Sequence, residues 1–169
     1  LVHSDGKTAQ KAVELINQYK DMDKPFFLAV GFVRPHVPLV APRKYFAPYA
    51  FDEMVLPPKI PGDWDDIPKN PGNRRTSESL QMDIPQQKKL IRAYYASVSY
   101  MDAMTGKVVK ALEKSGQRDN TIVIFTSDHG YHLGEHDLWS KVSIHEESAQ
   151  VPLIICVPGK QPAVCNSLV

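Results

Sequence analysis

Three short apolar runs place the strongest constraint on the fold of this 169-residue chain. They cover residues 26–33, 121–126 and 151–157, and turn-forming or polar residues bound each of them. Largely apolar runs of this length are typical of strands that are buried on both faces of a parallel sheet. Helical patterns precede the first two runs, so helices and strands alternate along the chain. We therefore predict an α/β fold with a mostly parallel central sheet flanked by helices.

Two helices are predicted from capping residues and apolar periodicity. The first begins at the cap residue Ser4 and reaches about Lys20. The second begins at Pro85, a residue suited to the first turn of a helix, and reaches about Lys114. Residues 34–84 between them are rich in proline and turn-forming residues, which predicts a long loop region.

Composition excludes several classes of protein. A net charge of +1 offers no electrostatic attraction for nucleic acid. No apolar run approaches ~18 residues, so no membrane span is predicted. The two cysteines, Cys156 and Cys165, are too few for a disulfide framework or a zinc ligand set. The hydrophobic content of 43% is sufficient for one globular core.

A polar cluster follows the second apolar run directly. Ser127-Asp128-His129-Gly130 comes after residues 121–126, where open α/β sheets bind ligands beyond the carboxyl ends of their strands. A carboxylate and an imidazole on one turn can reach the same divalent ion. The alternative is an ordinary turn, because Asp and Gly are common turn residues.

Two further residues have chemistry suited to an anionic substrate. His36 lies between Pro35 and Pro38 after the first apolar run, where a rigidly held imidazole can donate to an anionic oxygen. Lys141 can neutralise charge on a sulfate or phosphate group. The alternatives are a structural loop histidine and a solvated lysine.

Histidines at 129, 132 and 136 suggest a zinc site at first sight. Their spacing differs from the His-Glu-x-x-His helix of metalloproteases, and Gly134 interrupts the segment. We therefore reject a zinc protease.

The motifs follow one another in a characteristic order: an apolar strand, Pro-His-x-Pro, a long helix, a second strand, Ser-Asp-His-Gly, Leu-Gly-Glu-His, Trp-x-Lys and a Val-Pro-Leu-Ile strand. In this order the chain resembles the sulfatase family of the alkaline phosphatase superfamily, and within it the iduronate-2-sulfatase-like members. Residues 24–31, 95–102 and 125–130 show the likeness most clearly.

The resemblance implies a sulfuric ester hydrolase that removes sulfate from a sulfated sugar or glycosaminoglycan. It implies that Asp128 and His129 bind a calcium ion, with magnesium as the alternative ion. It also implies that His36 and Lys141 are catalytic residues that contact the sulfate. Sulfatases use a formylglycine nucleophile made from the Cys of a Cys-x-Pro/Ser-x-Arg motif, and this type works outside the cytoplasm, in the periplasm, the medium or the lysosome.

The chain lacks part of that machinery. Cys156 is followed by Val-Pro-Gly and Cys165 by Asn-Ser-Leu, so neither lies in the formylglycine motif. We expect the nucleophile segment upstream of Leu1 and a smaller C-terminal subdomain beyond Val169, which makes residues 1–169 an internal part of the catalytic domain. We predict that these residues alone are inactive, bind calcium weakly or not at all, and self-associate through exposed strand edges.

Three other functions remain open from the sequence. A phosphodiesterase or phosphonate monoester hydrolase of the same superfamily would use the same combination of metal and lysine on phosphorus. A non-catalytic module could bind sulfated glycans, although the basic cluster of Lys88, Lys89 and Arg92 is small for that role. A purely structural domain would leave His36 and Lys141 solvated. The identity of the nucleophile would distinguish this phosphorus ester hydrolase from a sulfatase.

Overall fold

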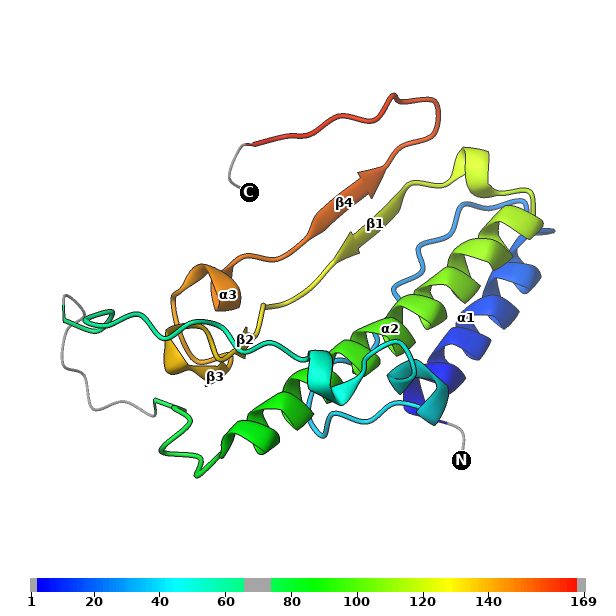
Figure 1. The fold of residues 1–169 in the computed structure, drawn as a ribbon. Helices are drawn as coiled ribbons and strands as arrows, with labels where there is room; N and C mark the ends of the chain where they lie inside the picture. The colour runs from blue at the N-terminus through cyan, green and yellow to red at the C-terminus, as the bar shows by residue number, and fades with distance from the viewer. Residues whose placement is uncertain (1–2, 66–73, 167–169) are drawn as a thin grey trace.

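The computed structural model describes residues 3–65 and 74–166, so residues 66–73 of the predicted loop lie outside the described part. Two long helices, α1 (Ser4–Tyr19) and α2 (Ile84–Lys114), pack side by side, as Figure 1 shows. Two longer strands, β1 (Val123–Thr126) and β4 (Leu153–Cys156), form a ribbon beside them. The remaining elements are short: η1 (Arg43–Phe46), η2 (Phe51–Glu53), η3 (Arg118–Asn120), β2 (His132–Leu133), η4 (Glu135–Asp137), β3 (Trp139–Ser140) and α3 (Glu146–Ala149).

Local sequence signals account for both ends of α2. Asp83 accepts a hydrogen bond from the backbone N–H of Gln86 at 2.8 Å, and the Gln86 side chain accepts one from the Asp83 N–H, also at 2.8 Å. This reciprocal pair is a capping box, and Pro85 occupies the first turn. Gly116 follows the helix with φ of 75°, a left-handed conformation that glycine adopts without strain. The prediction of both long helices is confirmed to within one residue at each end.

The described core lies between the helices and under the loops that cross them. It consists of three small clusters of buried residues: Ala9, Tyr100 and Met104; Ile16, Ala111 and Leu112; and Met54, Ile91 and Trp139. The first two clusters lie between α1 and α2. In the third, residues from the loop before α2 and from β3 pack against α2. Trp139 is 3% exposed.

The prediction of a mostly parallel sheet is wrong for the described residues. β1 pairs with β4 in antiparallel fashion, with Val123 opposite Cys156 and Thr126 opposite Leu153. β2 and β3 form a second antiparallel pair. A parallel partner needs a long crossover, usually a helix, whereas the chain between β1 and β4 contains the short β2–β3 pair, η4 and the four-residue α3. The chain therefore reverses and returns alongside β1.

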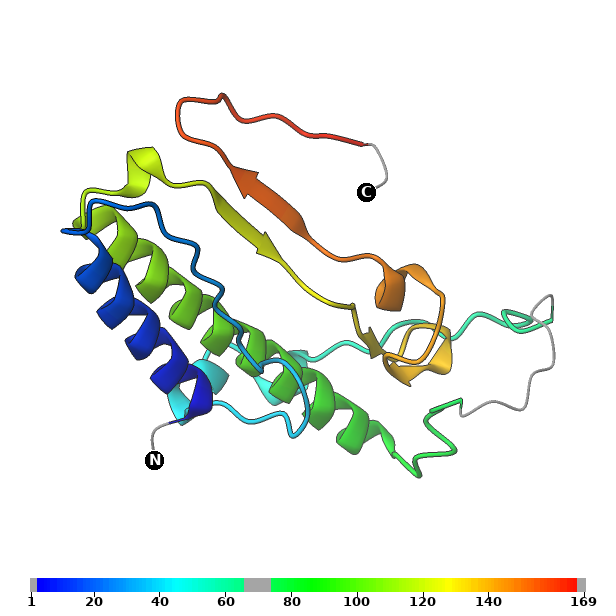
Figure 2. The ribbon, with the colours of Figure 1, turned by 180° about the vertical axis from the view of Figure 1, so that it is seen from behind.

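The first apolar run, residues 26–33, has no ladder partner among the described residues, so the strand predicted there is not formed. Its backbone is extended, and its residues alternate between half-buried and exposed. Phe26 and Leu28 pack against the α1–α2 interface, whereas Phe27 is 93% exposed. Figure 2 shows this segment running along the two helices. The segment has the conformation of a strand without the hydrogen-bonded neighbour that would complete one.

The β1–β4 ribbon is also more exposed than strands of a buried sheet. Ile124 is 62% exposed and Ile154 is 53% exposed. Apolar strand residues are normally covered by another layer, so this ribbon presents a surface suited to further packing. No helix in the described part of the chain is long and apolar enough to cross a membrane.

Candidate active site

A tight turn at the end of β1 contains the polar cluster predicted from the sequence. The backbone N–H of Gly130 donates to the carbonyl oxygen of Ser148 at 2.8 Å, which ties this turn to α3. A Cβ atom at position 130 would lie 2.0 Å from the carbonyl oxygen of Glu147. Only glycine fits so close to a neighbouring backbone, and Gly130 therefore fixes the path of the turn.

Asp128, His129 and Lys141 come together at this turn. The ring of His129 lies 2.6 Å from the Gly130 carbonyl oxygen through Nδ1 and 2.6 Å from Lys141 Nζ through Nε2. Both contacts are satisfied when Nδ1–H donates to the carbonyl and Nε2 accepts from the ammonium group. An oxygen of Asp128 lies 3.7 Å from the same Nε2. The turn thus brings one carboxylate, one imidazole and one cation into a single cluster.

The electrostatics of the turn keep Asp128 ionised. Its own backbone N–H, as a hydrogen-bond donor, lowers the pKa of the Asp128 carboxyl most, and the positive charge of the nearby Lys141 ammonium lowers it further. The side chain is 86% exposed. An ionised and accessible carboxylate next to a lysine ammonium can bind a cation while the ammonium attracts an anion.

The donors at this turn fit a divalent cation only in part. Asp128 offers oxygen and His129 offers nitrogen at a separation that two ligands of one ion can adopt. No third side chain among residues 3–65 and 74–166 joins them in a group of His, Cys, Asp or Glu donors. Lys141 also shares Nε2 of His129, so a metal bound there requires Lys141 to turn away. A complete calcium shell of ~6–8 ligands therefore needs donors beyond these two side chains.

The buried carboxylate of Asp5 positions the loop that contains His36. Asp5 is 1% exposed and accepts hydrogen bonds from the backbone N–H groups of Val33, at 3.1 Å, and Arg34, at 2.9 Å. The Arg34 side chain then donates to the carbonyl oxygens of His36 and Pro38. The loop is thereby anchored at the start of α1.

His36 itself is exposed, and its Nδ1 lies 2.7 Å from the carbonyl oxygen of Val37. Within the described residues, no hydrogen bond or ion pair joins His36 to Asp128, His129 or Lys141. The structure thus assembles three of the four predicted site residues and leaves His36 on a separate anchored loop.

A second cluster of titratable residues was missed by sequence reasoning. His132, His136 and His145 gather with Glu147 behind the turn, and the ring centroids of His136 and His145 are 4.2 Å apart. Burial lowers the pKa of His132, which favours its neutral ring. The sequence placed His129 with His132 and His136, but the fold separates His129 from them and adds His145 and Glu147. No periodic pattern signals that contact, because it depends on how the loop after β3 folds back.

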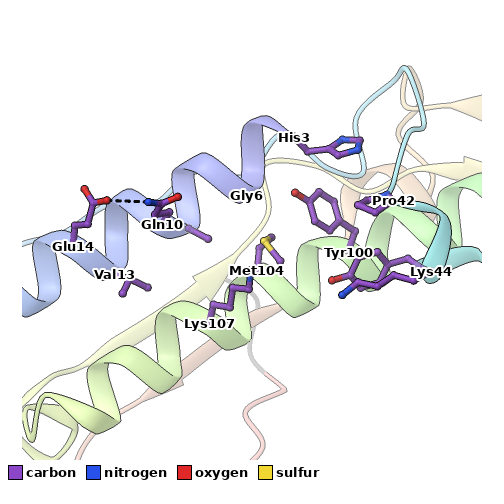
Figure 3. Close-up of a pocket in the computed structure, with 12 residues that line it drawn as sticks. His3, Gly6, Gln10, Val13, Glu14, Pro42, Lys44, Tyr100, Met104 and Lys107 are labelled. Carbon is purple, nitrogen blue, oxygen red and sulfur yellow. Dashed lines mark hydrogen bonds between the residues drawn. The ribbon is translucent and has the colours of Figure 1, made fainter. Parts of the chain in front are cut away.

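A hollow lined by residues of α1, η1 and α2 lies elsewhere in the described structure (Figure 3). Its volume is about 550 Å³, and its lining includes Tyr100, Met104 and Lys107 of α2, Val13 of α1 and His3, which precedes α1. None of the four predicted site residues lines it. The candidate site is therefore the open turn after β1 and not this hollow.

The chain is similar to known proteins over most of its length. The chain matches the sulfatase family model over residues 2–168. It is 34% identical to iduronate 2-sulfatase of Homo sapiens, covering 92% of this chain and 31% of that protein. It is 35% identical to choline-sulfatase of Rhizobium meliloti, again covering 92% of this chain and 31% of that protein.

A solved structure extends the comparison to the fold. The phosphonate monoester hydrolase of Silicibacter pomeroyi is similar with a TM-score of 0.79 at 25% identity, covering 95% of this chain and 34% of that chain. The helices and the β1–β4 ribbon are thus part of an alkaline phosphatase-like sulfatase fold. The chain spans about a third of the length of these relatives. The chain belongs to the sulfatase family.

Proposed function

We propose that this chain contributes an internal part of the catalytic domain of a sulfuric ester hydrolase. The observation that supports the proposal is the turn after β1, where an ionised carboxylate, an imidazole and a lysine ammonium meet. Hydrolysis of a sulfate ester breaks the bond between sulfur and the ester oxygen, and water supplies the oxygen that remains on sulfate. Negative charge grows on the departing oxygen, so nearby cations lower the barrier.

Each residue of the turn has a defined role in this proposal. Asp128 and His129 hold part of a calcium site, with magnesium as the alternative ion, and donors outside the described residues complete its ligand shell. The bound ion would neutralise charge on the sulfate oxygens. Lys141 contacts the sulfate and stabilises or protonates the leaving oxygen. His36 contacts the sulfate from its anchored loop, and the nucleophile is a formylglycine supplied by a segment other than residues 1–169.

The substrate proposed is a sulfated sugar or glycosaminoglycan of the kind that an iduronate-2-sulfatase-like enzyme accepts. The 34% identity to iduronate 2-sulfatase supports it, but the identity to choline-sulfatase is similar, at 35% over the same 92% of the chain. The similarity of this chain to its relatives therefore supports hydrolysis of a sulfate ester, but it does not favour one alcohol leaving group over another. By analogy with the family, we place the enzyme outside the cytoplasm.

The second candidate is hydrolysis of a phosphonate monoester or phosphodiester. The structural likeness to the phosphonate monoester hydrolase favours it, because a similar fold accommodates that reaction. Phosphoryl transfer relies on the same stabilisation of anionic oxygens by metal and lysine. A non-catalytic protein that binds sulfated glycans is the remaining alternative.

A substrate panel tests these proposals on the complete natural protein that contains this chain. Release of sulfate from an aryl sulfate and from a sulfated iduronate glycoside would be compared with hydrolysis of an aryl phosphonate monoester. We expect the sulfate esters to be preferred, and we expect activity to fall on chelation and to return with calcium. Preference for the phosphonate would favour the second candidate. Binding of sulfated glycans without turnover of any ester would contradict both hydrolases.

A further inference from the structure

The cluster behind the candidate active site combines nitrogen and oxygen donors at close range. One donor atom from each of His136, His145 and Glu147 lies within 4.8 Å of the other two. His136 Nε2 is 3.6 Å from Glu147 Oε2. Two ligands of a tetrahedral zinc ion are about 3.4 Å apart when each bond is ~2.0–2.1 Å long. The cluster therefore needs only small side-chain shifts to hold one ion.

The other nitrogen of His136 is held in a way that suits a metal ligand. Its Nδ1 lies 2.9 Å from Oδ2 of Asp63, on the loop before α2. Donation from Nδ1–H to this carboxylate leaves the lone pair of Nε2 directed toward Glu147. Histidines that bind metals usually carry such a carboxylate on their second nitrogen, because it fixes the tautomer and raises ligand basicity.

Two buried atoms of the cluster lack hydrogen-bond partners. Oε2 of Glu147 and Nδ1 of His132 are both inaccessible to solvent, and neither has a hydrogen-bond partner in the described part of the chain. His132 is 1% exposed, with its ring centroid 5.8 Å from that of His145. An unsatisfied buried carboxylate oxygen is costly, and a cation beside it removes that cost. The backbone at His136 is also left-handed, with φ of 56°, a conformation often found where a functional side chain must be aimed.

We infer that His136, His145 and Glu147 form a binding site for zinc or a similar divalent transition metal, distinct from the proposed calcium site at Asp128. Two imidazoles and one carboxylate make nitrogen the main donor, which favours a borderline-soft ion such as zinc over calcium, whose ligands are mostly oxygen. Asp63 and His132 lie around the site as supporting groups.

The position of the site suggests what the ion does. It would join three segments: the loop with Asp63, the η4 turn and the start of α3. The backbone of Glu147 and Ser148 also contacts Gly130 of the candidate active site. A bound ion would therefore brace α3 against the turn that positions Asp128 and His129. A protonated His136 between Asp63 and Glu147 is the alternative, and it requires no metal.

The test uses the complete natural protein after removal of metal with a chelator. Zinc affinity is measured by competition with a chromophoric chelator, and cobalt replaces zinc for the visible spectrum. Three variants probe the site. His145→Phe keeps the ring but removes a ligand, Glu147→Gln keeps the shape but removes the charge, and Asp63→Asn weakens the carboxylate behind His136. His3→Phe, whose ring packs on Tyr100, is the matched control, and Asp128→Asn separates the two proposed metal sites.

We expect one zinc ion per chain and the absorption of tetrahedral cobalt. His145→Phe and Glu147→Gln should weaken zinc binding more than about 100-fold, and Asp63→Asn about 10–100-fold. His3→Phe and Asp128→Asn should bind zinc as the parent protein does. If His145→Phe does not fold, Glu147→Gln and the cobalt spectrum of the parent decide the matter. No zinc uptake by the parent, parental affinity in Glu147→Gln, or loss of zinc only in Asp128→Asn would overturn the inference.

Discussion

The helical half and the strand half of this molecule differ in how completely the chain covers its own apolar residues. Ile91 of α2 is 2% exposed, whereas Ile154 of β4 is 53% exposed, although both belong to strongly apolar patterns. The helices cover each other and are covered by the loops that cross them, as Figure 1 shows. Among the described residues, segment 26–33 and β1 contact the helices on one face, through Phe26, Leu28 and Val123, whereas their other face and most of β4 have no covering layer. Their sequences are those of buried strands, so their burial depends on a further layer.

The largest predicted difference lies in the response to truncation of the two isoleucines. Ile91→Ala should lower the free energy of unfolding by about 2–5 kcal/mol, because it leaves a cavity against Met54 and Trp139. Ile154→Ala should change it by less than about 0.5 kcal/mol, because the side chain already contacts solvent. Urea unfolding of the 169-residue chain measures both. Equal losses would show that the two halves are packed alike.

A glycine pair tests the fixed path of the candidate site turn. Gly130→Ala should destabilise the chain by about 1–3 kcal/mol, since the new Cβ meets the Glu147 carbonyl oxygen and the backbone must move. Gly106→Ala is the matched control, because it lies within α2 with no atom within 4 Å of the added Cβ. There alanine should stabilise the helix by roughly 0.5–1 kcal/mol. Thermal unfolding should therefore shift in opposite directions, and a shared direction would refute the close approach at Gly130.

Loss of the capping box of α2 should reduce the stability of the helical half by a smaller amount. Asp83→Ala removes the acceptor for the Gln86 N–H and should cost about 1 kcal/mol. Asp83→Asn keeps an acceptor and should cost less. Chemical denaturation of the two variants gives the comparison. If both are as stable as the parent, α2 is held by packing alone.

Substitutions in the strand half should change the self-association of the chain more than its free energy of unfolding. We expect the 169-residue chain to self-associate as its concentration rises, because unpaired strand edges and exposed isoleucines favour contact with another chain. Ile154→Lys should reduce this association and leave the unfolding midpoint nearly unchanged. Sedimentation velocity over a range of concentrations measures it, and a strictly monomeric parent would contradict the prediction.

The sequence predicted the elements whose signals are local. Pro85 is the sequence signal for the start of α2, and the helix begins one residue earlier, at Ile84, and ends at the predicted Lys114. The antiparallel partner of β1 was not predicted, because strand direction depends on the connection and not on the apolar run. Residues 26–33 were predicted as a strand from composition, yet a ladder also needs a neighbour, and composition does not supply one.

In the candidate site too, contacts between residues close in sequence were predictable, and contacts between distant segments were not. Asp128 and His129 are adjacent in sequence and directly follow a strand, so their shared turn was predictable. Lys141 was expected near a bound anion, and its contact with His129 agrees with a shared site without testing its catalytic role. The cluster of His136, His145 and Glu147 escaped prediction. It arises where the loop after β3 folds back onto η4, and no spacing in the sequence encodes that fold.

The most direct test of the proposed chemistry is kcat/KM for sulfate ester hydrolysis by the complete natural protein and by Lys141→Met. Loss of the ammonium beside His129 should lower kcat/KM by about 10²–10³-fold, the usual effect of removing one group that stabilises transition-state charge. Lys160→Met, which changes an exposed lysine after β4, should leave kcat/KM unchanged. If Lys141→Met hydrolyses the ester as fast as the Lys160→Met control, the turn after β1 is not where the reaction occurs.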